Sequence, residues 1–195
     1  MPGSWIVVGV AAVFGFFVGS VNPATIIATV LHMDLHQGSG NPGATNAGRV
    51  LGVKWGVVVG VLDVLKGLVP TLLALWLADR FTAYVVGLAC VLGHVLSPFL
   101  RGRGGKGVAT SLGAVIVVFP WFALAMLAVF GLMLWLTRWV AGSSLVAAAL
   151  LGLYAGFAPL PEPVATGRLW GVSLALLVIV RHHRNIRGWV QRRLA

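Results

Sequence analysis

Long apolar runs dominate this chain of 195 residues and restrict the folds that are open to it. Only 9% of the residues are charged and 59% are hydrophobic, whereas a soluble domain carries about 25% charged residues. A helix that crosses a bilayer needs about 20 apolar residues. The sequence therefore predicts an all-α, polytopic transmembrane helical bundle that forms a single domain over residues 1–195. Seven membrane segments are expected: Trp5–Leu31, Trp55–Ala78, Phe81–Leu100, Val108–Phe119, Trp121–Leu136, Val140–Ala158 and Leu169–Val180.

The distribution of Lys and Arg predicts the orientation of these segments. Cytoplasmic loops of membrane proteins carry an excess of Lys and Arg. If the loops at 32–54 and 101–107 and the C-terminal tail all face the cytoplasm, an even number of crossings must link the second loop to the tail. Counting Val108–Phe119 and Trp121–Leu136 as separate crossings meets this condition, with the N-terminus outside and the C-terminus inside. Eleven of the 14 Lys and Arg residues then lie inside: Arg49, Lys54, Arg101, Arg103, Lys106, Arg138, Arg181, Arg184, Arg187, Arg192 and Arg193.

The net charge of +10 follows from these basic loops and from a shortage of acidic residues. Basic loops beside anionic lipid account for such a charge in a membrane protein. Membrane lipids are therefore expected as partners, and nucleic acid is not. Met1–Ser4 carries no basic side chain, so no cleaved signal peptide is expected.

Two glycine-rich loops interrupt the apolar pattern, and the first runs from Gly38 to Arg49. Glycine allows the backbone to approach a ligand closely, and successive backbone amides can surround an anion while Arg or Lys adds a full positive charge. The Ser and Asn side chains of this loop offer neutral donors, and Arg49 offers a planar fork that suits phosphate. A flexible connector is the alternative interpretation. The candidate substrate-binding residues here, besides Ser39 and Arg49, are Gly38, Gly40, Asn41, Gly43, Thr45 and Asn46.

The second loop runs from Arg101 to Gly107 and holds Lys106 between glycines. This spacing differs from a Walker A loop, which needs four residues between its glycines and Ser or Thr directly after the lysine. Hydrolysis of a nucleotide is therefore not expected, whereas an anion-binding role for Lys106 is. For Arg101 and Arg103, fixing the membrane topology is an alternative role that the sequence supports as well as anion binding. The candidate substrate-binding residues here, besides Lys106, are Gly104, Gly105 and Gly107.

Several other polar residues lie inside apolar segments or at their ends. Asp63 and Lys66 are three residues apart within the second segment, where ionisable groups normally pair. A structural ion pair is favoured, with a proton path as the alternative. His94 ends an apolar run, and a helix-end histidine without a catalytic role is its plain interpretation. His182 and Asn185 are three residues apart and so share a helical face; no metal site is expected, because His182 and its neighbouring histidine lack a third ligand at a suitable spacing.

Taken together, these stretches resemble the bacterial acyl-phosphate:glycerol-3-phosphate acyltransferase family, whose members are polytopic helical membrane enzymes. The resemblance spans nearly the whole chain, and the blocks GSGN–GATN and GGKGVAT are highly specific. The matching blocks are Gly19-Ser20, GSGNPGATNAGRVLG (38–52), LDVLKGLVP (62–70), GHVLSPFLRGRGGKGVATSLG (93–113) and HHRNI (182–186).

The resemblance implies transfer of an acyl group from acyl phosphate to the 1-hydroxyl of glycerol 3-phosphate, giving lysophosphatidic acid and phosphate in bacterial phospholipid biosynthesis. It implies a site on the cytoplasmic side of the inner membrane, without cofactor or metal. By family motif, Ser39, Arg49 and Lys106 form the phosphate pocket for the donor, together with backbone groups of the first loop. His94, His182 and Asn185 help to hold and orient glycerol 3-phosphate.

Two other functions fit part of the pattern. A membrane transporter of a phosphorylated anion would use the same basic loops, but it should also expose comparable binding groups on the outer side. Only Arg80, Arg168 and short turns are available there. A membrane scaffold without activity would explain the hydrophobicity and leave both glycine-rich loops unexplained.

Overall fold

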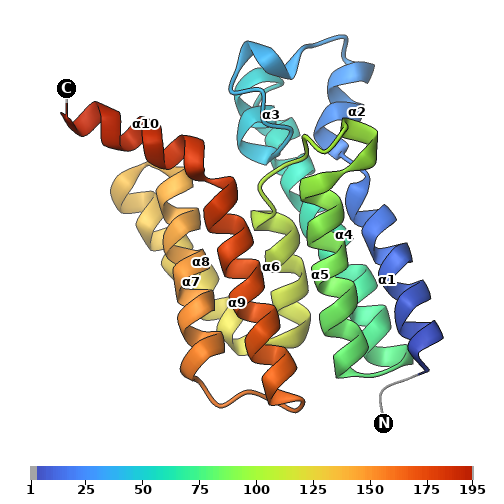
Figure 1. Ribbon diagram of the computed structural model, residues 1–195. Coiled ribbons are helices and arrows are strands. Elements are labelled where there is room, and N and C mark those ends of the chain that lie inside the picture. Colours follow the sequence, from blue (N-terminus) through green and yellow to red (C-terminus); the bar gives the residue numbers. More distant parts are fainter. Residues whose placement is uncertain (1–3, 195) are drawn as a thin grey trace. The chain divides into compact units, whose positions relative to one another are not determined.

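The computed structural model describes residues 4–194 and contains helices but no strand within that range (Figure 1). It divides into two compact units, Met1–Pro120 and Trp121–Ala195, and each is described by itself. That the whole chain acts as a single domain stays a prediction. The expected lack of a cleaved signal peptide concerns residues 1–4, and residues 1–3 lie outside the described part.

The first unit is built around α4, which packs against α3, α5 and α6, while α1 packs along α5. A short helix, α2, continues α1 after a break and also contacts α4. The elements are α1 (Trp5–Ser20), α2 (Pro23–Val30), η1 (Leu35–Gln37), α3 (Ala44–Val50), α4 (Val53–Leu77), α5 (Arg80–Leu96), η2 (Pro98–Leu100) and α6 (Val108–Val118).

The second unit packs α8 against α9. Stacking of Phe122 on Tyr154, with 4.1 Å between ring centroids, joins α7 to α8. Stacking of Trp139 on Trp189 joins the start of α8 to α10. The elements are α7 (Pro120–Thr137), α8 (Val140–Phe157), α9 (Val164–Arg181) and α10 (His183–Leu194).

Six helical stretches in the described residues are long and apolar enough to cross a membrane, and Val108–Val118 is a shorter apolar helix. This confirms the predicted helical membrane bundle, with the short fourth segment as expected. The last segment starts at Val164, five residues before the predicted Leu169, because the helix also includes Thr166, Gly167 and Arg168, which lie outside the apolar run. The six long stretches are Trp5–Val30, Val53–Leu77, Arg80–Leu100, Pro120–Thr137, Val140–Phe157 and Val164–Arg181.

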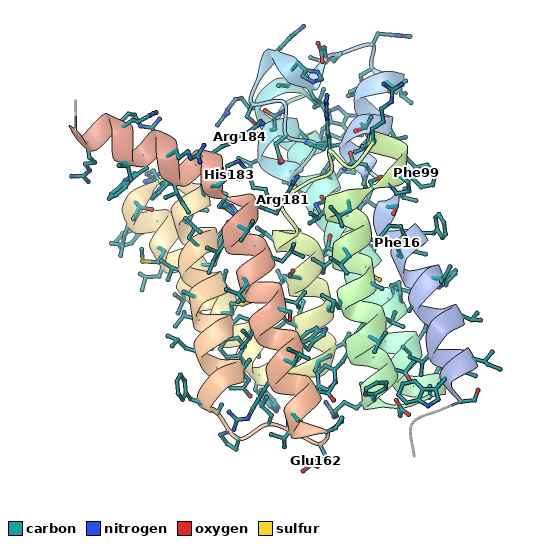
Figure 2. All side chains as sticks on the ribbon, in the orientation of Figure 1. Phe16, Phe99, Glu162, Arg181, His183 and Arg184 are labelled. Carbon is teal, nitrogen blue, oxygen red and sulfur yellow. The ribbon has the colours of Figure 1, made fainter. Side chains whose placement is uncertain are left out.

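Most basic side chains lie at one end of the helices within each unit, whereas Arg80 and Arg168 lie near the other end. In the first unit, Arg101 follows η2, beyond the end of α5, and Lys54 lies in the first turn of α4, whereas Arg80 is the first residue of α5. In the second unit, Arg181 and Arg184 lie where α9 meets α10, while Glu162 lies in the turn at the other end of α9 (Figure 2). This separation is what the positive-inside rule requires, although the N-out orientation itself stays a prediction.

Small residues let the helices of the first unit approach closely. A side-chain carbon at Gly19 of α1 would overlap the carbonyl of Cys90 on α5, and one at Gly93 would overlap the carbonyl of Phe16. A carbon at Gly67 of α4 would likewise meet the carbonyl of Thr110 on α6. Such contacts are the usual way in which helices pack in lipid, where van der Waals contact replaces the hydrophobic effect. They hold α5 and α6, between which the second glycine-rich loop lies, in fixed positions.

Candidate functional site

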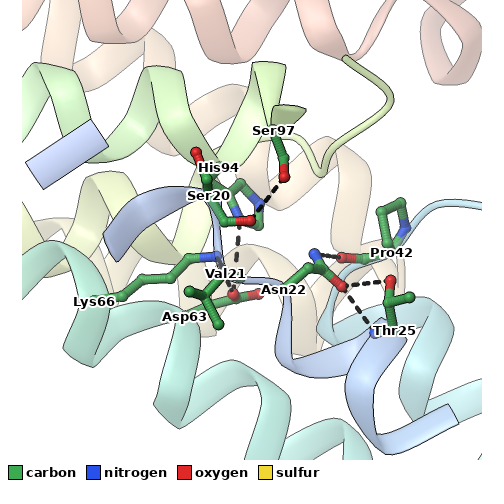
Figure 3. Close-up of polar contacts among 9 residues, drawn as sticks. All are labelled: Ser20, Val21, Asn22, Thr25, Pro42, Asp63, Lys66, His94 and Ser97. Carbon is green, nitrogen blue, oxygen red and sulfur yellow. Dashed lines mark hydrogen bonds and ion pairs between the residues drawn. The ribbon is translucent and has the colours of Figure 1, made fainter. Parts of the chain in front are cut away.

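Both glycine-rich loops are tied to the break between α1 and α2. At the break, Asn22 caps α2 by accepting hydrogen bonds from the amide and the hydroxyl of Thr25, each at 2.8 Å. The Asn22 amide group also donates to the carbonyl of Pro42 in the first loop, at 2.8 Å. The hydroxyl of Ser97, just before the second loop, donates to the carbonyl of Ser20 at 2.7 Å (Figure 3). The two loops are therefore anchored to neighbouring residues at the same end of the first unit.

Asn46 holds the first loop in shape. Its side-chain oxygen accepts from the Ser39 amide at 2.7 Å, and its side-chain nitrogen donates to the Leu35 carbonyl at 2.8 Å. Asn46 is 2% exposed, and a side-chain carbon at Gly38 would overlap its oxygen. The side chain of Asn46 therefore stabilises the loop itself. That Asn46 also contacts the substrate stays a prediction.

The outer surface of the first loop presents the groups that suit an anion. Ser39, Thr45 and Arg49 are exposed, and Arg49 lies in the last turn of α3. Gly40 has a φ of +71°, which glycine adopts without strain. Asn41 and Gly43 are partly exposed, so the loop combines a hydroxyl, amide groups and a guanidinium in a short stretch of backbone.

An acidic residue precedes this loop and is engaged locally. Asp34 caps η1, accepting from the His36 amide at 2.9 Å and lying 2.8 Å from the His36 ring nitrogen. Hydrogen bonds from the His36 amide and ring lower the pKa of Asp34 from its ordinary value. A lower pKa makes the Asp34 carboxylate a weaker proton acceptor, so Asp34 is a poor candidate for a general base.

The second loop folds back onto the end of α5. The Gly104 amide donates to the Val95 carbonyl and the Gly105 amide to the His94 carbonyl, each at 3.1 Å. Both glycines are buried, whereas Lys106 is partly exposed. Gly107, with a φ of +84°, caps α6, so Lys106 lies beside a helix N-terminus, where the partial positive charge favours an anion.

A buried charged cluster lies beneath this loop. Lys66 Nζ is 3.0 Å from Asp63 Oδ1, and both side chains are less than 10% exposed, which confirms the predicted ion pair. His94 Nδ1 lies 3.6 Å from the same oxygen. The spacing of residues in the sequence does not predict that His94 joins this ion pair, because His94 lies on α5 whereas Asp63 and Lys66 lie on α4. No group of three or more His, Cys, Asp or Glu side chains between residues 4 and 194 is placed to hold a metal ion, and the metal-free reaction stays a prediction.

His182 and Asn185 belong to the second unit, at the junction of α9 and α10. The backbone N–H of Asn185 donates to the backbone carbonyl of His182 at 2.8 Å, so a turn brings the two residues together as expected. His182 is 1% exposed, and its Nδ1 lies 2.8 Å from the Val178 carbonyl. Since a carbonyl only accepts, Nδ1 carries a proton, and in the neutral ring Nε2 then carries a lone pair.

Comparison with known proteins identifies the family. A family model described as glycerol-3-phosphate acyltransferase matches residues 9–192. The chain belongs to the glycerol-3-phosphate acyltransferase family. Two curated acyltransferases of that name illustrate the match. The one from Anaeromyxobacter sp. (strain Fw109-5) is 40% identical over 187 residues, covering 91% of this chain and 90% of the relative. The one from Aquifex aeolicus (strain VF5) is 40% identical over 178 residues, covering 89% and 91%.

Solved acyltransferase structures agree with this assignment. The glycerol 3-phosphate form of PlsY (YgiH), an integral membrane glycerol 3-phosphate acyltransferase, matches with a TM-score of 0.88 and 37% sequence identity, covering 95% of this chain and 93% of that chain. A lysophosphatidic acid form of PlsY matches with a TM-score of 0.86. The predicted family and the predicted enzyme class are thus confirmed, and an acyltransferase is favoured over a transporter or a scaffold. The roles assigned to individual acyltransferase residues remain predictions.

Replacement of Asn46 by Ala should destabilise the acyltransferase and loosen its first loop. The buried Leu35 carbonyl would lose its partner, which costs about 1–3 kcal/mol, and the part-buried Ser39 amide would also lose a partner. Thermal unfolding in detergent should show a lower midpoint for Asn46→Ala, whereas Gln37→Ala, an exposed change close by, should leave the midpoint unaltered. Equal midpoints for Asn46→Ala and the parent protein would contradict the bracing role of Asn46.

Proposed function

We propose that this acyltransferase moves a fatty acyl group from acyl phosphate to the 1-hydroxyl of glycerol 3-phosphate. The products are lysophosphatidic acid and inorganic phosphate. The observation that carries the proposal is the attachment of both glycine-rich loops to one helix break, through Asn22 and Ser97. A loop with Ser39 and Arg49 and a loop with Lys106 are thereby held at one end of the same unit.

The chemistry suits groups of this kind. Acyl phosphate is an activated mixed anhydride, so the transfer needs no nucleotide and no covalent enzyme intermediate. The two substrates each carry phosphate and repel one another, and positive side chains offset that repulsion. Attack on the carbonyl carbon builds negative charge on the carbonyl oxygen and on the departing phosphate. Fixed donors directed at such charge lower a barrier by about 3 kcal/mol each.

Ser39, Arg49 and Lys106 are proposed to hold the phosphate of the donor, with the amides of Gly40 and Gly43. The guanidinium of Arg49 matches two phosphate oxygens at once, and Lys106 adds a second positive charge near the N-terminus of α6. His182 and Asn185 are proposed to bind glycerol 3-phosphate, as the family motif implies.

An apolar groove in the first unit supports a donor with a fatty acyl chain. It has a volume of about 510 Å³ and lies between the helices α1, α2 and α4. Its wall includes Val21 and Pro23 at the helix break, next to the residues that anchor both loops. The remaining lining residues are Phe14, Val18, Ile26, Ile27, Leu62, Leu65, Lys66, Val69, Pro70 and Leu73. An acyl chain in this groove would place its activated end close to the loops.

The proton released by the attacking hydroxyl needs an acceptor, and neither loop contains a carboxylate. We infer that a phosphate oxygen of a substrate or a histidine takes it, with His94 and His182 as the candidate histidines. A His94→Gln/His182→Gln double variant, measured by turnover at saturating substrate, should lose at least a hundredfold if a histidine is the base, since general bases contribute about 10²–10⁴-fold. Full turnover in this variant would leave a substrate phosphate as the acceptor.

Both glycine-rich loops are proposed to lie on the cytoplasmic side of a bacterial inner membrane, where glycerol 3-phosphate is available. The concentration of most basic residues at one end of each unit supports this orientation. We infer an N-terminus outside, a C-terminus inside and a short Val108–Val118 segment that counts as one crossing.

Replacement of Arg49 or Lys106 by Ala should reduce transfer by at least a hundredfold, the typical cost of removing one donor to developing charge. The measurement is transfer of acyl from acyl phosphate to radiolabelled glycerol 3-phosphate in detergent. Lys54→Ala removes an exposed cation close to the first loop and should retain near-parental activity. Near-parental activity in both Arg49→Ala and Lys106→Ala would overturn the assignment of the phosphate pocket.

Labelling of single cysteines should report the orientation. In a Cys90→Ala background, Ser4→Cys should react with a membrane-impermeant thiol reagent added to intact spheroplasts. Gln37→Cys should react only after the membrane is permeabilised, because its loop is proposed to face the cytoplasm. The reverse pattern would place the loops outside.

A further inference from the structure

The proposed chemistry leaves Asp63 and Lys66, two members of the buried charged cluster of the first unit, without a role. The cluster consists of Asp63 and Lys66 on α4 and His94 on α5, and their side chains are 3%, 7% and 4% exposed. Charged groups in the membrane interior are costly, and they are retained where they serve a function. A buried ion pair adds little net stability over apolar side chains of similar size. The cluster therefore calls for an explanation beyond folding.

Lys66 connects the cluster to the helix break. Its ammonium group is 3.0 Å from Asp63 and donates to the Val21 carbonyl at 2.7 Å. A broken helix in lipid leaves carbonyl groups without their intrahelical partners, and these groups must be satisfied from elsewhere. Val21 is flanked by Ser20 and Asn22, the residues that anchor the two loops (Figure 3). Lys66 thus fixes the backbone to which both loops are attached.

His94 connects the cluster to the second loop. On one side its Nδ1 lies 3.6 Å from Asp63. On the other side its ring packs against Gly105 so closely that a side-chain carbon at position 105 would overlap Nε2. The backbone carbonyls of His94 and Val95 accept the amides of Gly105 and Gly104. Lys106 follows Gly105 directly in the chain, so the position of the His94 ring affects the position of Lys106.

We propose that Asp63, Lys66 and His94 are positioning residues that hold the Gly104–Lys106 loop in the geometry that binds the phosphate of the acyl donor. Asp63 fixes the His94 ring, the ring supports Gly105, and Lys66 fixes Asp63 and the helix break together. The inference rests on the proposed function, because it assigns Lys106 to the donor phosphate. It gives His94 a role through the loop in place of direct contact with glycerol 3-phosphate.

The test compares binding of a hydrolysis-resistant acyl phosphonate to the full-length protein in detergent. His94→Gln and Asp63→Asn should each raise the Kd by about ten- to a hundredfold, the size expected when a hydrogen bond to a charged group is lost. The His94→Gln/Lys106→Ala double variant should bind no more weakly than Lys106→Ala alone, since His94 acts through Lys106. Thr71→Val is the matched control: Thr71 is a fully buried polar residue on α4 whose hydroxyl donates to the Gly67 carbonyl, and its loss should leave the Kd unchanged.

Two binding results would overturn the proposal. An unchanged Kd in His94→Gln and Asp63→Asn, with only a lower unfolding midpoint, would show that the cluster serves folding alone. Additive losses in the His94→Gln/Lys106→Ala variant would show that His94 contacts the ligand independently of Lys106.

Hydrogen–deuterium exchange of residues 101–107 tests the cluster without any ligand. Exchange should be faster in His94→Gln and in Asp63→Asn than in the parent protein, and unchanged in Thr71→Val. If the parent protein failed to bind the acyl phosphonate, the proposed donor would be wrong, whereas faster exchange would still support the control of the loop by the cluster. Unchanged exchange in both cluster variants would overturn that control, whatever the donor is.

Discussion

The arrangement of this acyltransferase depends on three consecutive residues where its first membrane segment is broken. In lipid, the backbone groups of a helix form hydrogen bonds within the helix, and a break leaves some of these groups without their intrahelical partners. Here Ser97 donates to the Ser20 carbonyl and Lys66 donates to the Val21 carbonyl, while Asn22 caps the next helix and reaches the first loop. The hydrogen bonds that repair the break are the same ones that attach the functional loops, so membrane stability and site geometry share one set of contacts.

Much of the fold follows from local features of the sequence. The membrane segments are visible as apolar runs because a spanning helix must be long and continuously apolar. Both loops are visible because glycine and basic residues are out of place in such runs. The pairing of Asp63 with Lys66 follows from a spacing of three within one helix. Each of these signals lies within a short stretch of chain, and the structure confirms the bundle and the ion pair.

The contacts that shape the candidate site join residues far apart in sequence, and no local sequence pattern predicts them. Ser97 and Ser20 are 77 residues apart, and Asn22 and Pro42 are 20 apart. The break falls at Asn22-Pro23 within an apolar run, but no nearby residue indicates which groups satisfy it. The position of His94 between Asp63 and the second loop likewise depends on how α4 packs against α5. Asn46, a sequence candidate for binding substrate, is instead engaged in hydrogen bonds that hold its own loop.

The groove beside α1, α2 and α4 bears on how a lipid substrate travels. Several of its lining side chains, including Phe14, Ile26 and Leu73, are also exposed at the protein surface. Extracting an acyl chain from the bilayer into water costs about 0.8 kcal/mol for each CH₂. A donor that slides sideways from the leaflet into such a groove avoids this expense, and its product can depart by the same lateral route. Only the small polar acceptor and the released phosphate then need to exchange with the aqueous phase.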